Sequence, residues 1–294
     1  MAEHLQDAPF FRTGPEQPAS PVVLSVPHAG RAYSASLLKA VRLPRSLLEG
    51  LEDRLVDRLI WRAVQDGATA IVAQAPRAEI DLNRDEREVD PALIAPPPEA
   101  HEVLQSARTR GGLGLIPARI AGSGAIWLRR LSREELRRRI ETIHRPFHAA
   151  VAEALDAARA RFGVAVLLDC HSMPPRAAAT ADRAGPPPAI VFGDRHGTSI
   201  APALLDSAIG AADAMGYSWA CNSPYAGGYV VARHGAPAEG IHALQIEIDR
   251  SDYLDIRLRE PGRGFDRASR LIAAVAGALA DRALGDTLEA IAAE

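Results

Sequence analysis

The chain has 294 residues, of which 47% are hydrophobic and 24% charged, a balance typical of a globular protein that is long enough to bury a large core. Its 34 Lys and Arg residues against 37 Asp and Glu residues leave a formal net charge of −3, which excludes the positive field that binding to nucleic acid or an anionic membrane would need. Residues 1–20 lack the basic start and apolar run of a secretory signal, and no later stretch has the roughly 18 apolar residues of a membrane span, so we expect a cytoplasmic protein that acts on a small molecule.

The first part of the chain predicts two strands and a helix. From the N-terminus we expect a polar arm, a buried strand, a helix and a second strand, over residues 1–19, 21–27, 45–66 and 68–74. The first strand is short, rich in Val and bounded by Pro, and His28 lies at its C-terminal end. The helix is predicted by Leu residues spaced at threes and fours, and Gly67 is placed to end it.

Two stretches of irregular composition are expected to be loops. Residues 85–128 are rich in Pro and Gly and show little periodicity, and residues 173–188 have a similar composition. Between them, a capping-box pattern at the start of residues 132–161 predicts a long helix. The apolar run 163–169 then predicts a central buried strand, with His171 just past its C-terminal end.

The last third of the chain continues the alternation of strands and helices. We expect a strand, a helix and a strand over residues 189–194, 199–215 and 217–222, strand-like segments at 229–233 and 242–249, and a terminal helix over 265–284. Cys170 and Cys221 lie in apolar strand-like runs, where reduced thiols are expected. The alternation predicts a three-layer α/β fold with a mainly parallel or mixed central sheet and helices on both faces. Neither a linker nor a repeat interrupts the chain, so we expect a single domain over residues 1–294.

Two histidines indicate a shared site. His28 and His171 each follow a predicted strand although 143 positions separate them (171 − 28), and functional groups gather at the C-terminal ends of strands in open α/β sheets. Zinc hydrolases combine two such histidines with a carboxylate and leave a position open for water, whose pKa the metal lowers to about 7. Asp53 and Asp57 are four residues apart on one face of the predicted helix, and either could complete the site. Alternatively, both acids are solvated helix charges and each histidine is structural.

Glu247 is the carboxylate with the clearest sequence signal for a catalytic role. In HALQIEID, polar and apolar residues alternate, so that Gln245, Glu247 and Asp249 share one face of the predicted strand. An acid that projects toward a metal-activated water could act as general base and then as general acid. The alternative is an ordinary polar position on a half-exposed strand.

Further polar groups could either bind a substrate or be structural. Arg84 with Asn83 in IDLNR could bind a substrate carboxylate, because the guanidinium fork matches two oxygens. The turn-prone run 222–229 (NSPYAGGY) contains glycines that allow close backbone approach to a ligand. His234 could stabilise an oxyanion or lie on the surface. The segment HRPFH at 144–148 lacks the Glu of a zincin motif and is expected to be structural.

The order of these blocks is specific: PHAG after a strand, then DRLVD, IDLNR, HRPFH, DCHS, NSPYAGGY with RHG, and HALQIEI. Together they resemble the N-formylglutamate amidohydrolase family from about residue 20 to residue 255. The resemblance implies a zinc-hydrolase (phosphorylase/hydrolase-like) architecture and one Zn²⁺ ion per chain. It further implies His28 and His171 as ligands, with Asp53 as the third ligand and Asp57 as the alternate.

The resemblance also implies a reaction. Glu247 becomes the general acid and base, we place His234 among the catalytic residues, and the expected pocket residues are Asn83, Arg84, Ser172, Asn222, Gly227, Gly228 and Tyr229. The implied reaction is hydrolysis of the amide bond of an N-acyl amino acid, with N-formyl-L-glutamate, giving glutamate and formate, as the leading substrate. Members that degrade histidine tend to carry an aromatic residue and a His where this chain has Arg54, Leu55 and Val56, so the acyl amino acid stays open. The alternatives are a zinc peptidase or cell-wall-type amidase, and a metal-free binding module with the same fold.

Overall fold

The computed structural model describes residues 8–175 and 187–292, so most of the loop expected at 173–188 lies outside the described residues. Contacts between residues divide the chain into two compact units, each assembled from separate stretches. Unit 1 comprises Met1–Phe11, Pro27–Glu52 and Val72–Ala150, and unit 2 comprises Arg12–Val26, Asp53–Ile71 and Val151–Glu294. A single domain over the whole chain stays a prediction.

Seven strands form the main sheet. In their spatial order they are β1 (Phe10–Thr13), β3 (Thr69–Ala73), β2 (Val22–Val26), β8 (Ala165–Met173), β11 (Ile241–Asp249), β9 (Ile190–Gly193) and β10 (Trp219–Cys221). β8 is parallel to both β2 and β11, and β10 is parallel to β9, whereas β9 runs antiparallel to β11. The prediction of a mainly parallel or mixed central sheet is confirmed.

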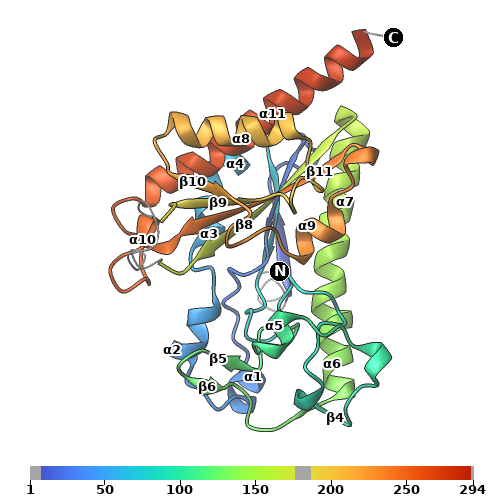
Figure 1. Cartoon of the computed structure of the whole chain (residues 1–294), viewed down its shortest axis with the longest axis vertical. Helices are drawn as coiled ribbons and strands as arrows, with labels where there is room; N and C mark the ends of the chain where they lie inside the picture. The colour runs from blue at the N-terminus through green and yellow to red at the C-terminus, as the bar shows by residue number, and fades with distance from the viewer. Residues whose placement is uncertain (1–7, 176–186, 293–294) are drawn as a thin grey trace. The chain divides into compact units, whose positions relative to one another are not determined.

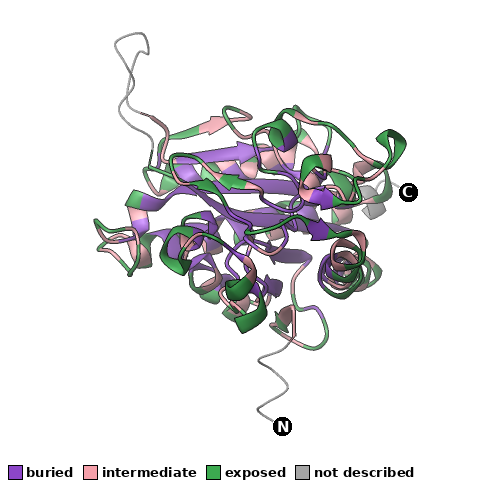
Figure 2. Ribbon diagram, turned by 90° about the horizontal axis from the view of Figure 1, so that it is seen from below, coloured by how far each residue is buried: buried purple, intermediate pink, exposed green. Residues whose placement is uncertain are grey.

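The pair β8 and β11 forms the centre of this sheet. Every residue of β8 is buried, as is every residue of β11 after the first two, which is expected of parallel strands that are covered on both faces. Figure 2 shows strands of this sheet in purple, the colour of buried residues. The register places Glu247 on β11 directly opposite His171 on β8, so two of the predicted site residues are neighbours across this strand pair.

A long C-terminal helix packs on the sheet of unit 2. Helix α11 (Phe265–Ala292) contacts β2 and β8 as well as the helices α3 (Val56–Leu59), α4 (Trp61–Gln65) and α8 (Pro202–Ala214). Its buried apolar residues recur at threes and fours and therefore share one helix face: Ala268, Leu271, Ile272, Val275, Ala276, Leu279 and Ala283. Figure 1 shows α11 beside α8. Among the described residues, no helix is both long and apolar enough to cross a membrane.

Two short helices of unit 2 lie next to the central strand pair. Helix α9 (Tyr229–His234) contacts β8 and β11, and a 3₁₀ turn (Pro237–Glu239) leads from it into β11. Helix α10 (Arg250–Tyr253) begins directly where β11 ends. Both helices therefore present side chains near the strands that carry His171 and Glu247.

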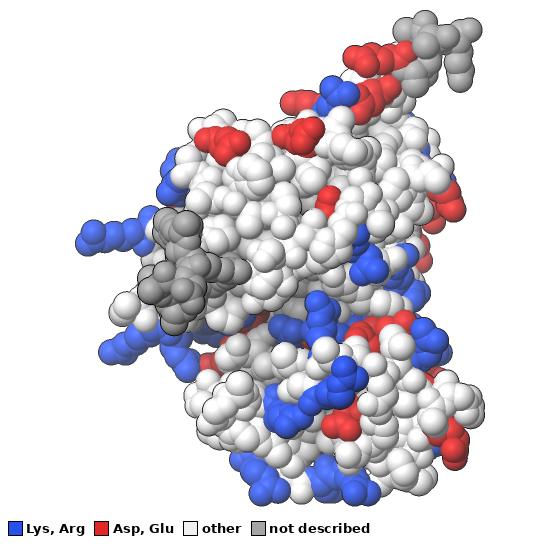
Figure 3. Space-filling model, viewed as in Figure 1, with Lys and Arg blue, Asp and Glu red and all other residues white. Residues whose placement is uncertain are grey.

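Unit 1 is built from short elements and from the first part of a long helical run, which belongs to unit 2 from Val151 on. The short elements are α1 (Ala35–Ala40), α2 (Arg45–Leu48), α5 (Ala107–Arg110), 3₁₀ turns at Glu49–Leu51, Pro91–Leu93 and Ala100–Glu102, and the strand pairs β4 (Ile94–Ala95) with β7 (Leu131–Ser132) and β5 (Arg119–Ile120) with β6 (Gly124–Ala125). The run passes from α6 (Arg133–Arg139) through a π-helical turn (Ile140–His144) into α7 (Arg145–Phe162), as predicted for 132–161. Ser132 caps it by accepting a hydrogen bond from the Glu135 N–H (3.0 Å). Basic and acidic side chains are interspersed on the face of unit 1 in Figure 3, in keeping with ion pairs such as Arg145–Glu86 (2.8 Å).

The helix expected over residues 45–66 is the largest error of the sequence prediction. The helical turns in its first part end at Leu51. Helix α3 begins only at Val56, because Leu55 adopts a left-handed conformation with φ 63°. Asp53 therefore lies in a non-helical segment, and it does not share a helix face with Asp57. The Leu spacing predicted a continuous helix, although Gly50 lies two residues before the non-helical segment.

Other boundaries also differ from the prediction. Residues 229–233 were expected to form a strand from their β-branched content but form most of α9, where tertiary contacts override propensity. Phe10–Thr13, expected in the polar arm, forms the edge strand β1. His171 lies within β8 and not past its end, because the polar residues that seemed to close the strand are themselves buried.

Gly30 in the PHAG block provides a test of the packing of unit 1. A Cβ at this residue would lie 2.0 Å from the backbone oxygen of Ala75, so Gly30→Ala requires the backbone to shift. We expect it to lower the free energy of unfolding by about 1–3 kcal/mol, as overpacking does. Gly50→Ala is the matched control, because nothing lies within 4 Å of that Cβ, and it should change stability by less than about 1 kcal/mol. Urea unfolding of both variants measures this, and equal stability of the two would refute the expectation.

Candidate active site

His171 lies between two buried carboxylates. It donates through Nδ1 to Asp53 Oδ2 (2.8 Å) and through Nε2 to Asp169 Oδ2 (2.8 Å). Asp169 precedes it by two residues on β8, so both side chains leave the same face of the strand. Burial alone would lower the pKa of the His171 imidazole, but Asp169 and Asp53 raise it well above its usual range. The surroundings of His171 therefore stabilise positive charge.

Asp53 is held in place from α10. Its Oδ1 accepts a hydrogen bond from Arg250 Nη2 (3.0 Å), while Arg250 Nε donates to Ser172 Oγ (3.0 Å). One residue further on, the Arg54 carbonyl accepts a hydrogen bond from the Tyr253 hydroxyl (2.7 Å). These bonds fix the non-helical segment that carries Asp53. Arg250 was not predicted from the sequence, although its position directly after the strand with Glu247 was a usable signal.

His28 has a carboxylate partner of its own. It follows β2 by two residues and donates through Nε2 to Asp81 Oδ1 (2.7 Å). Asp81 also accepts hydrogen bonds from Arg77 Nε (2.9 Å) and from the Asn83 N–H (2.9 Å). Burial alone would raise the pKa of Asp81, but the neighbouring cations hold it well below its usual range. Asp81 was not among the residues of IDLNR that the sequence predicted for the site, which were Asn83 and Arg84.

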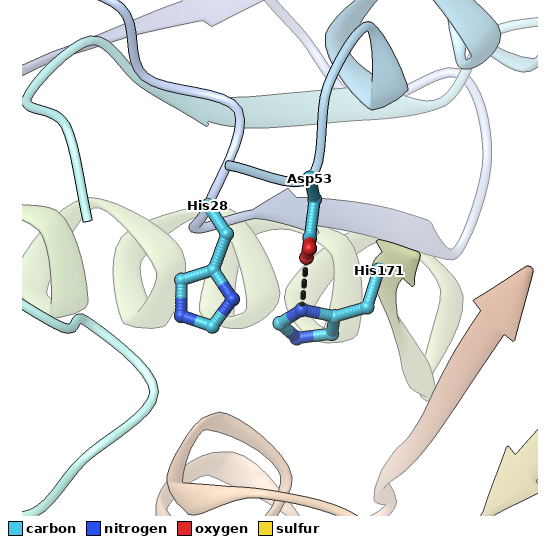
Figure 4. A group of neighbouring side chains, drawn as sticks. All are labelled: His28, Asp53 and His171. Carbon is cyan, nitrogen blue, oxygen red and sulfur yellow. Dashed lines mark hydrogen bonds and ion pairs between the residues drawn. The ribbon is translucent and has the colours of Figure 1, made fainter. Parts of the chain in front are cut away.

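His28, Asp53 and His171 form a group that could hold a metal ion. Each offers one ligand atom, these atoms all lie within 4.8 Å of one another, and the three residues are buried. Figure 4 shows the three side chains, with the bond from His171 to Asp53 dashed. Two imidazoles and one carboxylate are the donor set of a catalytic zinc site. The Nε2 atoms of His28 and His171 bond to Asp81 and Asp169, and such carboxylate–histidine pairs orient zinc ligands.

Glu247 lies directly across the strand pair from His171. It is buried, and its Oε1 accepts a hydrogen bond from Gln245 Nε2 (2.9 Å). The Oε1 of Gln245 in turn accepts the backbone N–H of Gly228 (2.8 Å), which precedes α9. The preceding Gly227 has φ 103°, a conformation that favours glycine.

The remaining candidates of unit 2 lie on α9 and before it. Asn222 donates to Asp194 Oδ1 (2.6 Å), and the Tyr229 hydroxyl accepts from Arg233 Nη1 (2.7 Å). His234 is buried on α9, and burial, with Arg233 adding to the effect, lowers its pKa to about 4. The imidazole of His234 is therefore neutral near pH 7.

In unit 1, Asn83 and Arg84 belong to a densely bonded segment. The buried Arg84 donates to two backbone carbonyls, including that of Asn83 (2.6 Å). His144 Nε2 donates to the Arg84 carbonyl (2.9 Å), and His148 Nε2 donates to the Leu82 carbonyl (3.0 Å). These bonds agree with a structural role for HRPFH, since the two histidines hold the backbone of the segment that begins with Asp81.

A family model and several similar proteins all carry N-formylglutamate in their names. A family model described as N-formylglutamate amidohydrolase matches residues 20–254. The chain is 32% identical over 239 residues to an N-formylglutamate deformylase of Pseudomonas putida, covering 80% of this chain and 82% of the relative. Over 241 residues it is 29% identical to the enzyme of that name from Pseudomonas aeruginosa, with the same coverage. The crystal structure of N-formylglutamate amidohydrolase from Ralstonia eutropha JMP134 is similar with a TM-score of 0.85 and 36% identity, covering 93% of this chain and 98% of that chain.

The geometry predicts which acid is the third metal ligand. Asp53→Asn should weaken zinc binding by more than about 100-fold, because it removes a carboxylate from the group with His28 and His171. Asp57→Asn is the control, since Asp57 is half-buried on α3 and is not part of this group. Zinc titration against a competing chelator measures both affinities. Unchanged affinity in Asp53→Asn would remove Asp53 from the ligand set.

Proposed function

This chain belongs to the N-formylglutamate amidohydrolase family, and from that premise we propose that it hydrolyses N-formyl-L-glutamate to L-glutamate and formate with one zinc ion held by His28, Asp53 and His171. The observation that carries the proposal is the buried group of two imidazoles and a carboxylate. It supports a hydrolytic metal centre in a chain whose named relatives cleave this amide.

The residues fit zinc better than a harder cation. Mg²⁺ and Ca²⁺ prefer oxygen ligands, whereas two imidazole nitrogens with one carboxylate oxygen suit Zn²⁺. The field at His171 favours a cation, because Asp53 and Asp169 both contact its ring. When bound, zinc supplies Lewis acidity that polarises an amide carbonyl and acidifies a water molecule.

The proton transfers of the proposal belong to Glu247. In its ionised form it takes a proton from the attacking water, and the resulting acid returns that proton to the departing nitrogen as the C–N bond breaks. The formyl carbon leaves as formate and the nitrogen becomes the amine of glutamate. His234, which is neutral near pH 7, donates a hydrogen bond to the oxygen on which negative charge develops. We propose that the substrate is bound by Asn83, Arg84, Ser172, Asn222, Gly227, Gly228 and Tyr229.

Glu247→Gln tests the catalytic assignment. The amide keeps the size of the side chain but cannot accept a proton, so kcat should fall by about 10² to 10⁴ while zinc content and Tm stay at wild-type values. A fall in kcat with little change in KM is expected for an interaction made mainly in the transition state. Glu239→Gln is the control, because Glu239 is exposed in the turn that leads into β11. If Glu247→Gln kept more than about a tenth of the wild-type kcat, Glu247 would not be the base.

A substrate panel with and without zinc tests the reaction itself. We expect the zinc-loaded protein to hydrolyse N-formyl-L-glutamate faster than N-acetyl-L-glutamate, N-formyl amino acids without a side-chain carboxylate, and dipeptides. Chelation should abolish turnover and added zinc should restore it, because the proposed reaction depends on the Lewis acidity of the zinc ion. Preferred cleavage of peptides would favour a peptidase, and stoichiometric zinc without turnover of any N-acyl amino acid would favour a binding module.

A further inference from the structure

Gln245 and Glu247 are alternate residues of β11 and leave the same face of the strand. Both are buried, and Gln245 is only 3% exposed. Its side-chain amide makes two hydrogen bonds: Oε1 accepts from the Gly228 N–H (2.8 Å), and Nε2 donates to Glu247 Oε1 (2.9 Å). One amide therefore joins the backbone before α9 to the proposed general base.

The direction of this amide is fixed by its partners. A backbone N–H can only donate, so the atom of Gln245 that faces Gly228 must be the oxygen. The NH₂ group then faces Glu247, whose ionised carboxylate can only accept a hydrogen bond from it. The usual ambiguity between the oxygen and nitrogen of a glutamine side chain does not arise here.

We propose that Gln245 is a positioning residue for the hydrolysis, which orients the carboxylate of Glu247 and ties that orientation to the backbone at Gly228. The inference rests on the proposed function, because it assumes that Glu247 moves the proton. Gly228 is the residue before α9, which carries Tyr229 and His234. A displacement of residues 222–229 is thereby transmitted to Glu247 through the Gln245 side chain.

A catalytic group that is misplaced by about 1 Å can lose about 100-fold in rate, so loss of this bond is measurable. Two substitutions separate the two hydrogen bonds of Gln245. Gln245→Glu keeps the length of the side chain and an oxygen for the Gly228 N–H, but its ionised carboxylate cannot donate to Glu247. Gln245→Met keeps the approximate length and loses both hydrogen bonds.

The experiment measures kcat and KM for N-formyl-L-glutamate with the full-length, zinc-loaded enzyme at a fixed pH near 8. We expect Gln245→Glu to lower kcat by about 10- to 100-fold with KM within about threefold of wild type. Gln245→Met should lower kcat as much and also raise KM by at least about fivefold, because the backbone at Gly228 loses its partner as well. Zinc content should equal that of wild type in both variants.

Ser199→Ala is the matched control. The buried Ser199 hydroxyl donates to the Ala243 carbonyl (2.8 Å), so this variant also removes a buried hydrogen bond from β11, two residues before Gln245. It should lower Tm about as much as Gln245→Met and leave kcat within about twofold of wild type. A similar loss of kcat in Ser199→Ala would show that any weakening of the strand suffices, and it would overturn the proposal.

Glu247→Gln, measured in parallel, distinguishes a failure of the positioning role of Gln245 from a failure of the catalytic role of Glu247. If Glu247→Gln loses kcat while both Gln245 variants keep it within about threefold of wild type, the positioning role is wrong and the proposed function stands. If Glu247→Gln itself keeps its kcat, the assignment of the base is wrong and the role of Gln245 is refuted with it. Loss of kcat in all three variants, with normal zinc content and an active Ser199→Ala, supports the proposal.

Discussion

Burial of several carboxylates around one imidazole is the constraint on which the rest of this site depends. Asp53 and Asp169 both bond to His171, and Glu247 lies opposite it on the next strand. Removing carboxylates from water is costly unless positive charge accompanies them. Arg250 supplies one such charge through its bond to Asp53. A cation between Asp53 and the histidines would supply more, so the arrangement favours metal binding on electrostatic grounds as well as by donor type.

The sheet accounts for how residues so distant in sequence come near one another. β2, β8 and β11 are parallel neighbours, so their C-terminal ends share one edge, and these strands lead to His28, carry His171 and carry Glu247, respectively. Their side chains are held by hydrogen bonds to Asp81, Asp169 and Gln245, respectively. In unit 1, His144, at the end of a π-helical turn, and His148 bond to the backbone of the segment that supplies Asp81 to His28.

The sequence predicted the parts of the site that follow from strand order. His28 and His171 could be placed together because apolar runs precede both, and Glu247 could be assigned a face because polar and apolar residues alternate around it. The resemblance named Asp53, but the backbone around it was predicted wrongly as a helix, since the chain breaks there at a left-handed Leu55. Gln245 and Arg250 were also missed, because their roles depend on partners at Gly228 and Ser172 that only the folded chain brings near.

We propose above all that His28, Asp53 and His171 together hold a catalytic zinc ion. Crystals of the zinc-loaded protein, with diffraction data collected on both sides of the zinc absorption edge, test it most directly. We expect one anomalous peak per chain at about 2.0–2.2 Å from a nitrogen of each histidine and from a carboxylate oxygen of Asp53. A peak that lacks any of these three ligands, or a stoichiometric zinc ion bound elsewhere, would contradict it.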